Sequence, residues 1–110
     1  MRKRVVVTGL GCISPVGNDV ETAWKHVVAG RSGIDRITQF DTSDHQVKIA
    51  AEVKDFNGKK RFGRREARRM DVVGQYALAA TQEAVEDAQL SIDDHSRDRI
   101  GVVVGTGIGG

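Results

Sequence analysis

Apolar and polar residues are distributed along this 110-residue chain in three patterns, and each pattern predicts a kind of element. Two runs rich in β-branched residues, at 5–8 and 100–104, are almost continuously apolar, which is typical of strands buried on both faces of a parallel sheet. Residues 47–53 alternate between apolar and more polar positions, which predicts a strand with one wetter face, at a sheet edge. Two longer segments have the spacing of helices.

The first predicted helix follows a loop in which glycine and proline keep the backbone out of helical conformation. We expect Asn18 to be its N-cap, with Glu21 three residues later in a capping-box arrangement. Gly30 is placed to end the helix. The helix has a single apolar stripe, which comprises Val20, Ala23, Trp24, Val27 and Val28.

The second predicted helix covers residues 70–90 and either continues or restarts from 64–69. Its stripe is made of small residues, which permit close approach of another backbone and deep packing. That stripe comprises Val73, Ala77, Ala80, Ala84 and Ala88.

We expect the remaining segments to be connections. These are a structured loop at 31–46, a turn at 57–58 and a polar connection at 91–99. The resulting order of strand, helix, strand, helix, strand predicts an α/β layered fold with right-handed crossovers.

Length and composition narrow the class of protein. The chain has the size of one domain, or of a piece of one. It holds no run of about 18 apolar residues, and glycine comes too early for a signal peptide, so we expect a cytoplasmic protein without a membrane partner. Cys12 is the only cysteine, which excludes an intramolecular disulfide and a cysteine-rich zinc site.

The formal net charge of +2 hides a concentrated basic segment. Residues 59–69 contain seven basic residues and one acid, which makes this segment +6 and the rest of the chain −4. The segment can be a solvated helical face, a nucleic-acid site or a docking site for an acidic protein. Phe62, its only aromatic residue, offers little base stacking. On a helix, Arg65, Arg68 and Arg69 would form a compact cationic patch.

The glycine-rich segments also suggest a nucleotide site. Residues 105–110 satisfy the G-x-G-x-x-G pattern after a predicted strand, but the physical motif also needs a helix opening at the third glycine. In the first loop, Gly9 and Gly11 are followed by Ser14 where the pattern needs a third glycine. These segments therefore favour tight turns over a dinucleotide site.

The residues that could act as a nucleophile or as metal ligands, one cysteine and three histidines, lie far apart in the sequence. Cys12 has no histidine close in sequence, which favours a structural role. We interpret His26 as an exposed or half-buried side chain, and His45 and His95 lie in polar loops. Their spacing matches no metal template, so we predict no metal site.

Several motifs, in order along the whole chain, resemble the β-ketoacyl-acyl carrier protein synthases. The similarity is strongest to the elongating type II synthases, within the thiolase-like condensing enzymes. The motifs are the first strand and loop at 5–18, Trp24, Gly-Arg-Ser-Gly-Ile at 30–34, Phe-Asp-Thr-Ser at 40–43, Arg-Arg-Glu-Ala-Arg-Arg-Met-Asp at 64–71 and Gly-Thr-Gly-Ile-Gly-Gly at 105–110.

This resemblance implies a duplicated, five-layered α/β/α/β/α fold working as a homodimer. The family moves an acyl group from acyl carrier protein to a cysteine thiol. It then decarboxylates malonyl-carrier protein, with two histidines assisting, and joins the two groups by Claisen condensation. The resemblance implies no metal or redox cofactor and no nucleic-acid partner.

The resemblance also implies where this chain lies in such an enzyme. We expect residues 1–110 to be an incomplete N-terminal portion of the synthase N-terminal domain. We expect this portion to be inactive, because the family's cysteine and histidines correspond to positions after Gly110. We also expect it to fold poorly alone, because its strands would lack half of their sheet and expose unpaired edges. By position, Arg65, Arg68 and Arg69 match the basic patch that docks carrier protein, and Ile108 matches a residue bordering the acyl pocket.

Other functions stay open from the sequence. One is a non-catalytic chain-length partner subunit or a ketosynthase of polyketide synthesis. Another is a small dinucleotide- or nucleic-acid-binding module.

Overall fold

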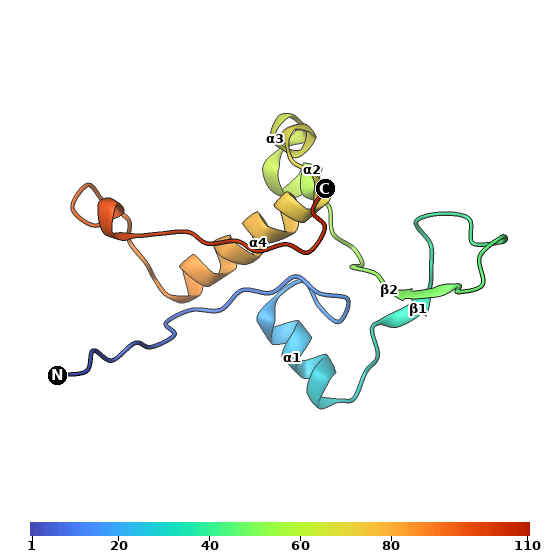
Figure 1. Cartoon of the computed structure of the whole chain (residues 1–110), viewed down its shortest axis with the longest axis horizontal. Coiled ribbons are helices and arrows are strands. Elements are labelled where there is room, and N and C mark those ends of the chain that lie inside the picture. Colours follow the sequence, from blue (N-terminus) through green and yellow to red (C-terminus); the bar gives the residue numbers. More distant parts are fainter. The chain divides into compact units, whose positions relative to one another are not determined.

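The computed structural model describes residues 1–110, which divide into two compact units. One unit comprises residues 12–57 and contains helix α1 (Val20–Val28) and strands β1 (Ile34–Arg36) and β2 (Ile49–Ala51). The other comprises residues 1–11 and 58–110. Its elements are α2 (Gly58–Phe62), α3 (Arg64–Arg69), α4 (Val72–Asp87) and the short 3-10 helix η1 (Arg97–Arg99) (Figure 1). None of these helices combines the length and apolar character needed to cross a bilayer.

Helix α1 forms where the sequence predicts it, but it begins one residue later than expected. Its N-cap is Asp19, whose carboxylate accepts hydrogen bonds from Thr22 N at 2.7 Å and Thr22 Oγ1 at 2.9 Å. The prediction of Asn18 as N-cap was wrong because the Asn18 amide donates instead to Lys54 O, at 2.7 Å. Glu21 pairs with Lys25 on the next turn rather than completing a capping box. Gly30, at φ +69°, ends the helix as predicted.

The apolar stripe of α1 is not buried as a whole. Ala23 is its only buried member, and it faces Gly17, where an added Cβ would lie 2.9 Å from Ala23 Cα. Trp24 remains 65% exposed, and Val27 and Val28 are exposed as well.

Strands β1 and β2 form a two-stranded antiparallel sheet, in which Ile34 is opposite Ala51 and Arg36 is opposite Ile49. The predicted strand at 47–53 is confirmed over its centre, and it lies at a sheet edge. The interpretation of residues 31–46 as loop throughout was wrong, since backbone pairing with β2 makes 34–36 a strand. Just beyond β2, the Glu52 carboxylate accepts hydrogen bonds from the Thr38 amide and hydroxyl and from the Gln39 amide.

Helix α4 confirms the predicted long helix and its close approach to another backbone. Gly9 and Gly11 lie directly against its small residues, so a Cβ at either position would overlap main-chain atoms of Ala84 or Ala80. Between the two glycines, the Leu10 amide donates to the Asp87 carboxylate at 3.0 Å. The first glycine pair therefore serves close packing, because no other residue leaves room for the helix.

The two strands predicted at 5–8 and 100–104 do not form in the structure. Their valines are exposed, with Val5 at 93% and Val103 at 99%. A parallel strand is stabilised by neighbours on both sides and by cover on both faces. Neither segment has a strand partner within residues 1–110. Both segments have the apolar sequence of a buried strand, but residues 1–110 do not form the surface that would bury them.

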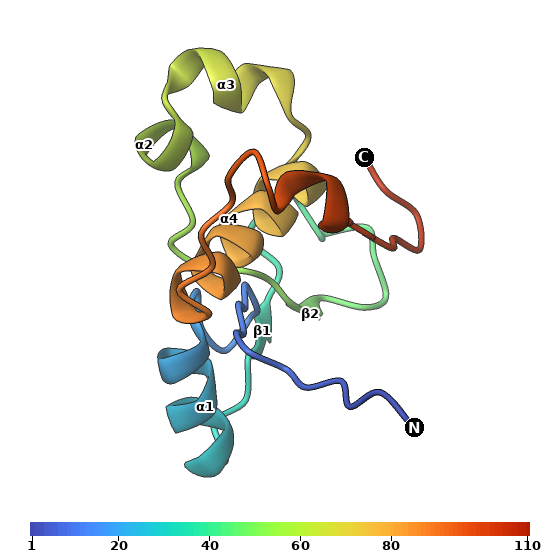
Figure 2. The ribbon, with the colours of Figure 1, turned by 90° about the vertical axis from the view of Figure 1, so that its left-hand side faces the viewer.

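The basic segment folds into two short helices rather than one. Gly58 opens α2, so the predicted turn at 57–58 was wrong. Gly63 separates α2 from α3 at φ +83°, a left-handed conformation that favours glycine. Met70 is extended, so α4 restarts rather than continues from α3. Helices α2 and α3 pack against each other beyond the N-terminal end of α4 (Figure 2).

Candidate functional site

The most highly charged surface of the chain lies on α2 and α3, and we call it the basic surface. All of its cationic residues are exposed. They are Lys59, Lys60, Arg61, Arg64, Arg65, Arg68 and Arg69. The structure thus confirms that residues 64–69 are helical and that the predicted docking arginines share one short helix.

The orientation of α3 follows from its one buried residue. Ala67 is 7% exposed, and Arg65 and Arg69 lie two residues before and after it. At about 100° per residue, both are about 200° around the helix from Ala67, on the side turned away from the protein. Arg68 lies about 100° around the helix from Ala67, on the flank between the buried side and the outer side. The predicted docking residues therefore occupy the outer half of α3.

One carboxylate interrupts this cationic field. Glu66 lies 3.9 Å from the Arg69 guanidinium, an exposed i, i+3 pair. Such pairs contribute only about 0.3–0.5 kcal/mol, so Arg69 can exchange this partner for another. Arg65 and Arg68 form no ion pair within the chain.

Sequence reasoning missed Gln75, a half-buried residue in the first turn of α4. Its side-chain amide donates to Ala67 O at 3.1 Å and to Met70 O at 3.2 Å, the carbonyls at the end of α3. A glutamine within an alanine-rich helix gives no local signal of such a contact, because the partners are set by how the helices pack.

Ile108 lies apart from α3 in sequence, on the loop at 105–110, and its side chain is fully exposed. No helix opens in this loop, and no strand precedes it. The loop thus has the spacing of a dinucleotide motif without its strand-turn-helix context.

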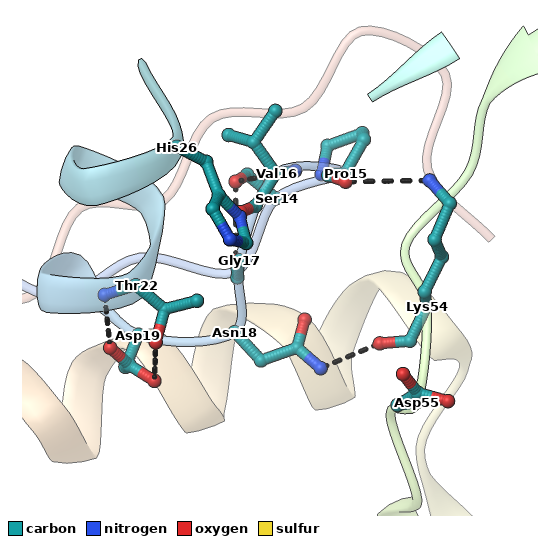
Figure 3. Close-up of a pocket in the computed structure, with 10 residues that line it drawn as sticks. All are labelled: Ser14, Pro15, Val16, Gly17, Asn18, Asp19, Thr22, His26, Lys54 and Asp55. Carbon is teal, nitrogen blue, oxygen red and sulfur yellow. Dashed lines mark hydrogen bonds between the residues drawn. The ribbon is translucent and has the colours of Figure 1, made fainter. Parts of the chain in front are cut away.

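A cavity of about 280 Å³ lies in the other unit, around the start of α1 (Figure 3). Lys54 forms one wall, and its ammonium group donates to Gly33 O at 2.9 Å and Glu52 O at 3.1 Å. The other wall is the loop before α1, and the lining residues are Ser14, Pro15, Val16, Gly17, Asn18, Asp19, Thr22, His26, Lys54 and Asp55. No predicted site residue lines this cavity.

His26 and Cys12 are the two residues considered above as a metal ligand and a nucleophile that are half-buried in the structure. His26 is half-buried, as predicted, with Nδ1 2.5 Å from Val16 O and Nε2 3.2 Å from the Arg31 guanidinium. These contacts fit the neutral tautomer with the proton on Nδ1, because Arg31 can only donate. Cys12 is half-buried and belongs to no disulfide.

Three carboxyl groups have pKa values below their ordinary range, and all three lie outside the helices and strands. Hydrogen bonds from the Ser43 hydroxyl and amide lower the pKa of Asp41. Hydrogen bonds from Thr38 lower the pKa of Glu52, and those from Ser96 lower that of Asp93. None of them belongs to the basic surface.

Comparisons with known proteins agree over nearly the whole chain. Residues 2–110 match the family model described as "Beta-ketoacyl synthase, N-terminal domain". The chain is 54% identical, over 98% of its length, to a 3-oxoacyl-[acyl-carrier-protein] synthase 2 of Staphylococcus aureus. It is 49% identical, over 99% of its length, to the protein of the same name from Synechocystis. It spans 26% of the length of each of these relatives.

A solved structure gives the same result for the fold. The ishigamide ketosynthase/chain length factor superposes on 83% of this chain and 23% of its own, with a TM-score of 0.75 and 43% identity. The predicted α/β class, as the N-terminal part of a thiolase-like fold, is therefore confirmed.

Proposed function

The chain belongs to the family of β-ketoacyl synthase N-terminal domains, and from this premise we propose that the whole protein is a 3-oxoacyl-acyl carrier protein synthase of fatty acid biosynthesis. Two relatives named 3-oxoacyl-[acyl-carrier-protein] synthase 2, from Staphylococcus aureus and Synechocystis, support the proposal at about half identity. The chain spans about a quarter of their length, so the activity is proposed for the whole protein and not for residues 1–110 alone.

The proposed reaction has two stages. A cysteine thiol displaces the thiol of acyl-carrier protein and holds the acyl group as a thioester. Malonyl-carrier protein then loses CO₂, and the resulting carbanion attacks that thioester, which releases the cysteine and forms the 3-oxoacyl product. We place this cysteine and the two assisting histidines outside residues 1–110, and Cys12 has no part in the chemistry.

We propose that this chain contributes the docking surface for acyl carrier protein, through Arg65, Arg68 and Arg69. The observation that carries the proposal is an exposed segment of charge +6 with a single acid, on a helix whose outer side is cationic. Guanidinium groups form charge-assisted hydrogen bonds with the carboxylates of an acidic partner, and the field speeds encounter. The same charge without stacking aromatics gives little support to nucleic-acid binding.

Ile108 is proposed to border the acyl pocket, where its branched side chain would limit acyl length. Two further features of the whole protein are proposals of the same kind, namely a homodimer and a cytoplasmic location. The relatives are named as synthases, which favours an enzyme over a chain-length partner subunit and over a dinucleotide- or nucleic-acid-binding module.

Charge reversal on α3 tests the docking proposal. In the full-length protein, Arg65→Glu, Arg68→Glu and Arg69→Glu together replace three positive charges by three negative ones and bring residues 59–69 from +6 to zero. We expect the KM for carrier-protein substrates to rise at least about tenfold, which is about 1.4 kcal/mol. The KM for free acyl thioesters should stay unchanged, because these lack the carrier's carboxylates.

A matched control separates local docking from net charge. Arg2→Glu, Lys3→Glu and Arg4→Glu change the net charge equally at exposed positions of the same unit, away from α3. This control should raise the KM for carrier-protein substrates much less. If the α3 triple variant raises KM for both substrate classes alike, or matches the control, the basic surface is a solvated face.

A further inference from the structure

We infer that Gln75 is a positioning residue for the basic surface, holding α3 so that its arginines meet carrier protein in one fixed arrangement. The part of this inference that is tested by KM for carrier-protein substrates rests on the proposed docking function. Helix α3 has only six residues. Helices shorter than about 12–15 residues are marginal in water by themselves, so the arrangement of Arg65, Arg68 and Arg69 needs support from outside the helix.

Gln75 supplies that support at the end where α3 needs it. The last carbonyls of a helix have no donor within the helix. Gln75 Nε2 donates to two carbonyls at this end, Ala67 O and Met70 O, and so uses both of its protons on α3. One of the two acceptors belongs to Ala67, the buried residue of the helix.

The oxygen of the same amide lies against the neighbouring helix. Gly58 is the first residue of α2, and a Cβ added there would overlap Gln75 Oε1 and lie 2.7 Å from Gln75 Cδ. A single side chain therefore touches the start of α2 and the end of α3, the two helices that carry the seven cationic residues.

Helix α4 is long and packed well enough to hold the Gln75 side chain in place. It has 16 residues, its Ala79 is 1% exposed, and Gln75 N donates to Asp71 O at 3.0 Å in its first turn. Without the Gln75 amide, two carbonyls at the end of α3 lose their donors, and the helix can fray or turn. Carrier protein would then have to order the arginines as it binds, and this cost weakens binding.

The test uses Gln75→Met in the full-length protein, because methionine keeps the length of the side chain and removes its donor without changing charge. We expect the KM for carrier-protein substrates to rise about fivefold, the effect of roughly one net hydrogen bond. The KM for free acyl thioesters and kcat should not change. Gln82→Met is the matched control, since Gln82 lies on the same helix and is exposed.

Two measurements show whether Gln75 acts through the arginines. In the Arg65→Glu, Arg68→Glu, Arg69→Glu background, Gln75→Met should add nothing further to KM. Hydrogen exchange should show faster exchange of the amides of residues 64–69 in Gln75→Met than in Gln82→Met. Unchanged exchange of α3 overturns the inference, and so does an equal rise in KM for free thioesters or an undiminished effect in the triple variant.

If the proposed docking function is wrong, the KM and hydrogen-exchange measurements give a different combination of results. If the triple variant itself leaves the KM for carrier protein unchanged, docking at α3 is wrong. The exchange rates of residues 64–69 would then still report whether the Gln75 amide holds α3.

Discussion

The packing of Gly11 against α4 gives a sharp prediction about stability. An ideal Cβ on Gly11 would lie 2.7 Å from the Ala80 carbonyl carbon and 3.0 Å from Ala84 N, and it would overlap Ala80 O. All three are main-chain atoms of α4, so no side-chain rotation can relieve the overlap. Gly11→Ala must therefore move the segment at 9–11 away from the helix.

The magnitude follows from two costs. Inserting a methyl group into a tight contact costs about 1–3 kcal/mol. The displaced segment also loses the hydrogen bond from Leu10 N to the Asp87 carboxylate, worth about 1 kcal/mol at this exposed position. We expect Gly11→Ala to lower the free energy of unfolding by about 2–4 kcal/mol.

Two other glycines provide matched controls. At Gly74, inside α4, the nearest neighbour of an added Cβ is Met70 Cβ at 3.8 Å, an ordinary contact. Gly74→Ala should therefore stabilise the protein by about 0.5–1 kcal/mol, through the lower entropy of its unfolded chain. Gly101 has nothing within 4 Å of an added Cβ, so Gly101→Ala should be close to neutral.

Urea unfolding of the full-length protein, followed by circular dichroism, compares the three variants. The expected order of stability is Gly74→Ala, then wild type and Gly101→Ala together, and then Gly11→Ala. A Gly11→Ala protein as stable as Gly101→Ala would refute the close packing of the first glycine loop on α4.

Three further predictions concern single side chains. Glu66→Gln frees Arg69 and should lower the KM for carrier-protein substrates about twofold at low salt, an effect that 0.5 M salt should abolish. Glu52 has a lowered pKa because Thr38 donates to it, so its stabilisation is complete above its ordinary pKa and is lost as the pH falls through the lowered pKa; the unfolding free energies of wild type and Glu52→Gln, measured in urea across this acidic range, should converge as the pH falls. Gln89 follows the C-cap of α4 at φ +50°, so Gln89→Gly should raise the unfolding free energy by about 1 kcal/mol, measured in urea.

Local patterns in the sequence predict the helices well. The apolar spacing after Gly17, the Gly30 stop and the alanine-rich stretch are properties of a few neighbouring residues, and α1 and α4 form where these patterns lie. The small stripe on α4 also predicts its close contact with a backbone, which Gly9 and Gly11 provide. The position of the cationic patch along the chain could be predicted directly from the sequence, because the charges of its side chains do not depend on folding.

Features that depend on distant partners could not be read in the same way. Asn18 and Asp19 are both good N-caps, and the choice between them depends on Lys54 O, 36 residues away from Asn18. The valines at 5–7 and 102–104 have the composition of buried strands, but burial requires neighbours that residues 1–110 do not provide.

The sequence by itself determined helices α1 and α4, the family motifs and a concentrated +6 segment, because each of these is carried by residues close together in the chain. Only the tertiary structure decided how that charge is presented. It turned Ala67 inward and Arg65 outward, and it brought the Gln75 amide to the end of α3. The physical reason is that a helix of six residues takes its orientation from its packing partners, and the spacing within it does not specify them.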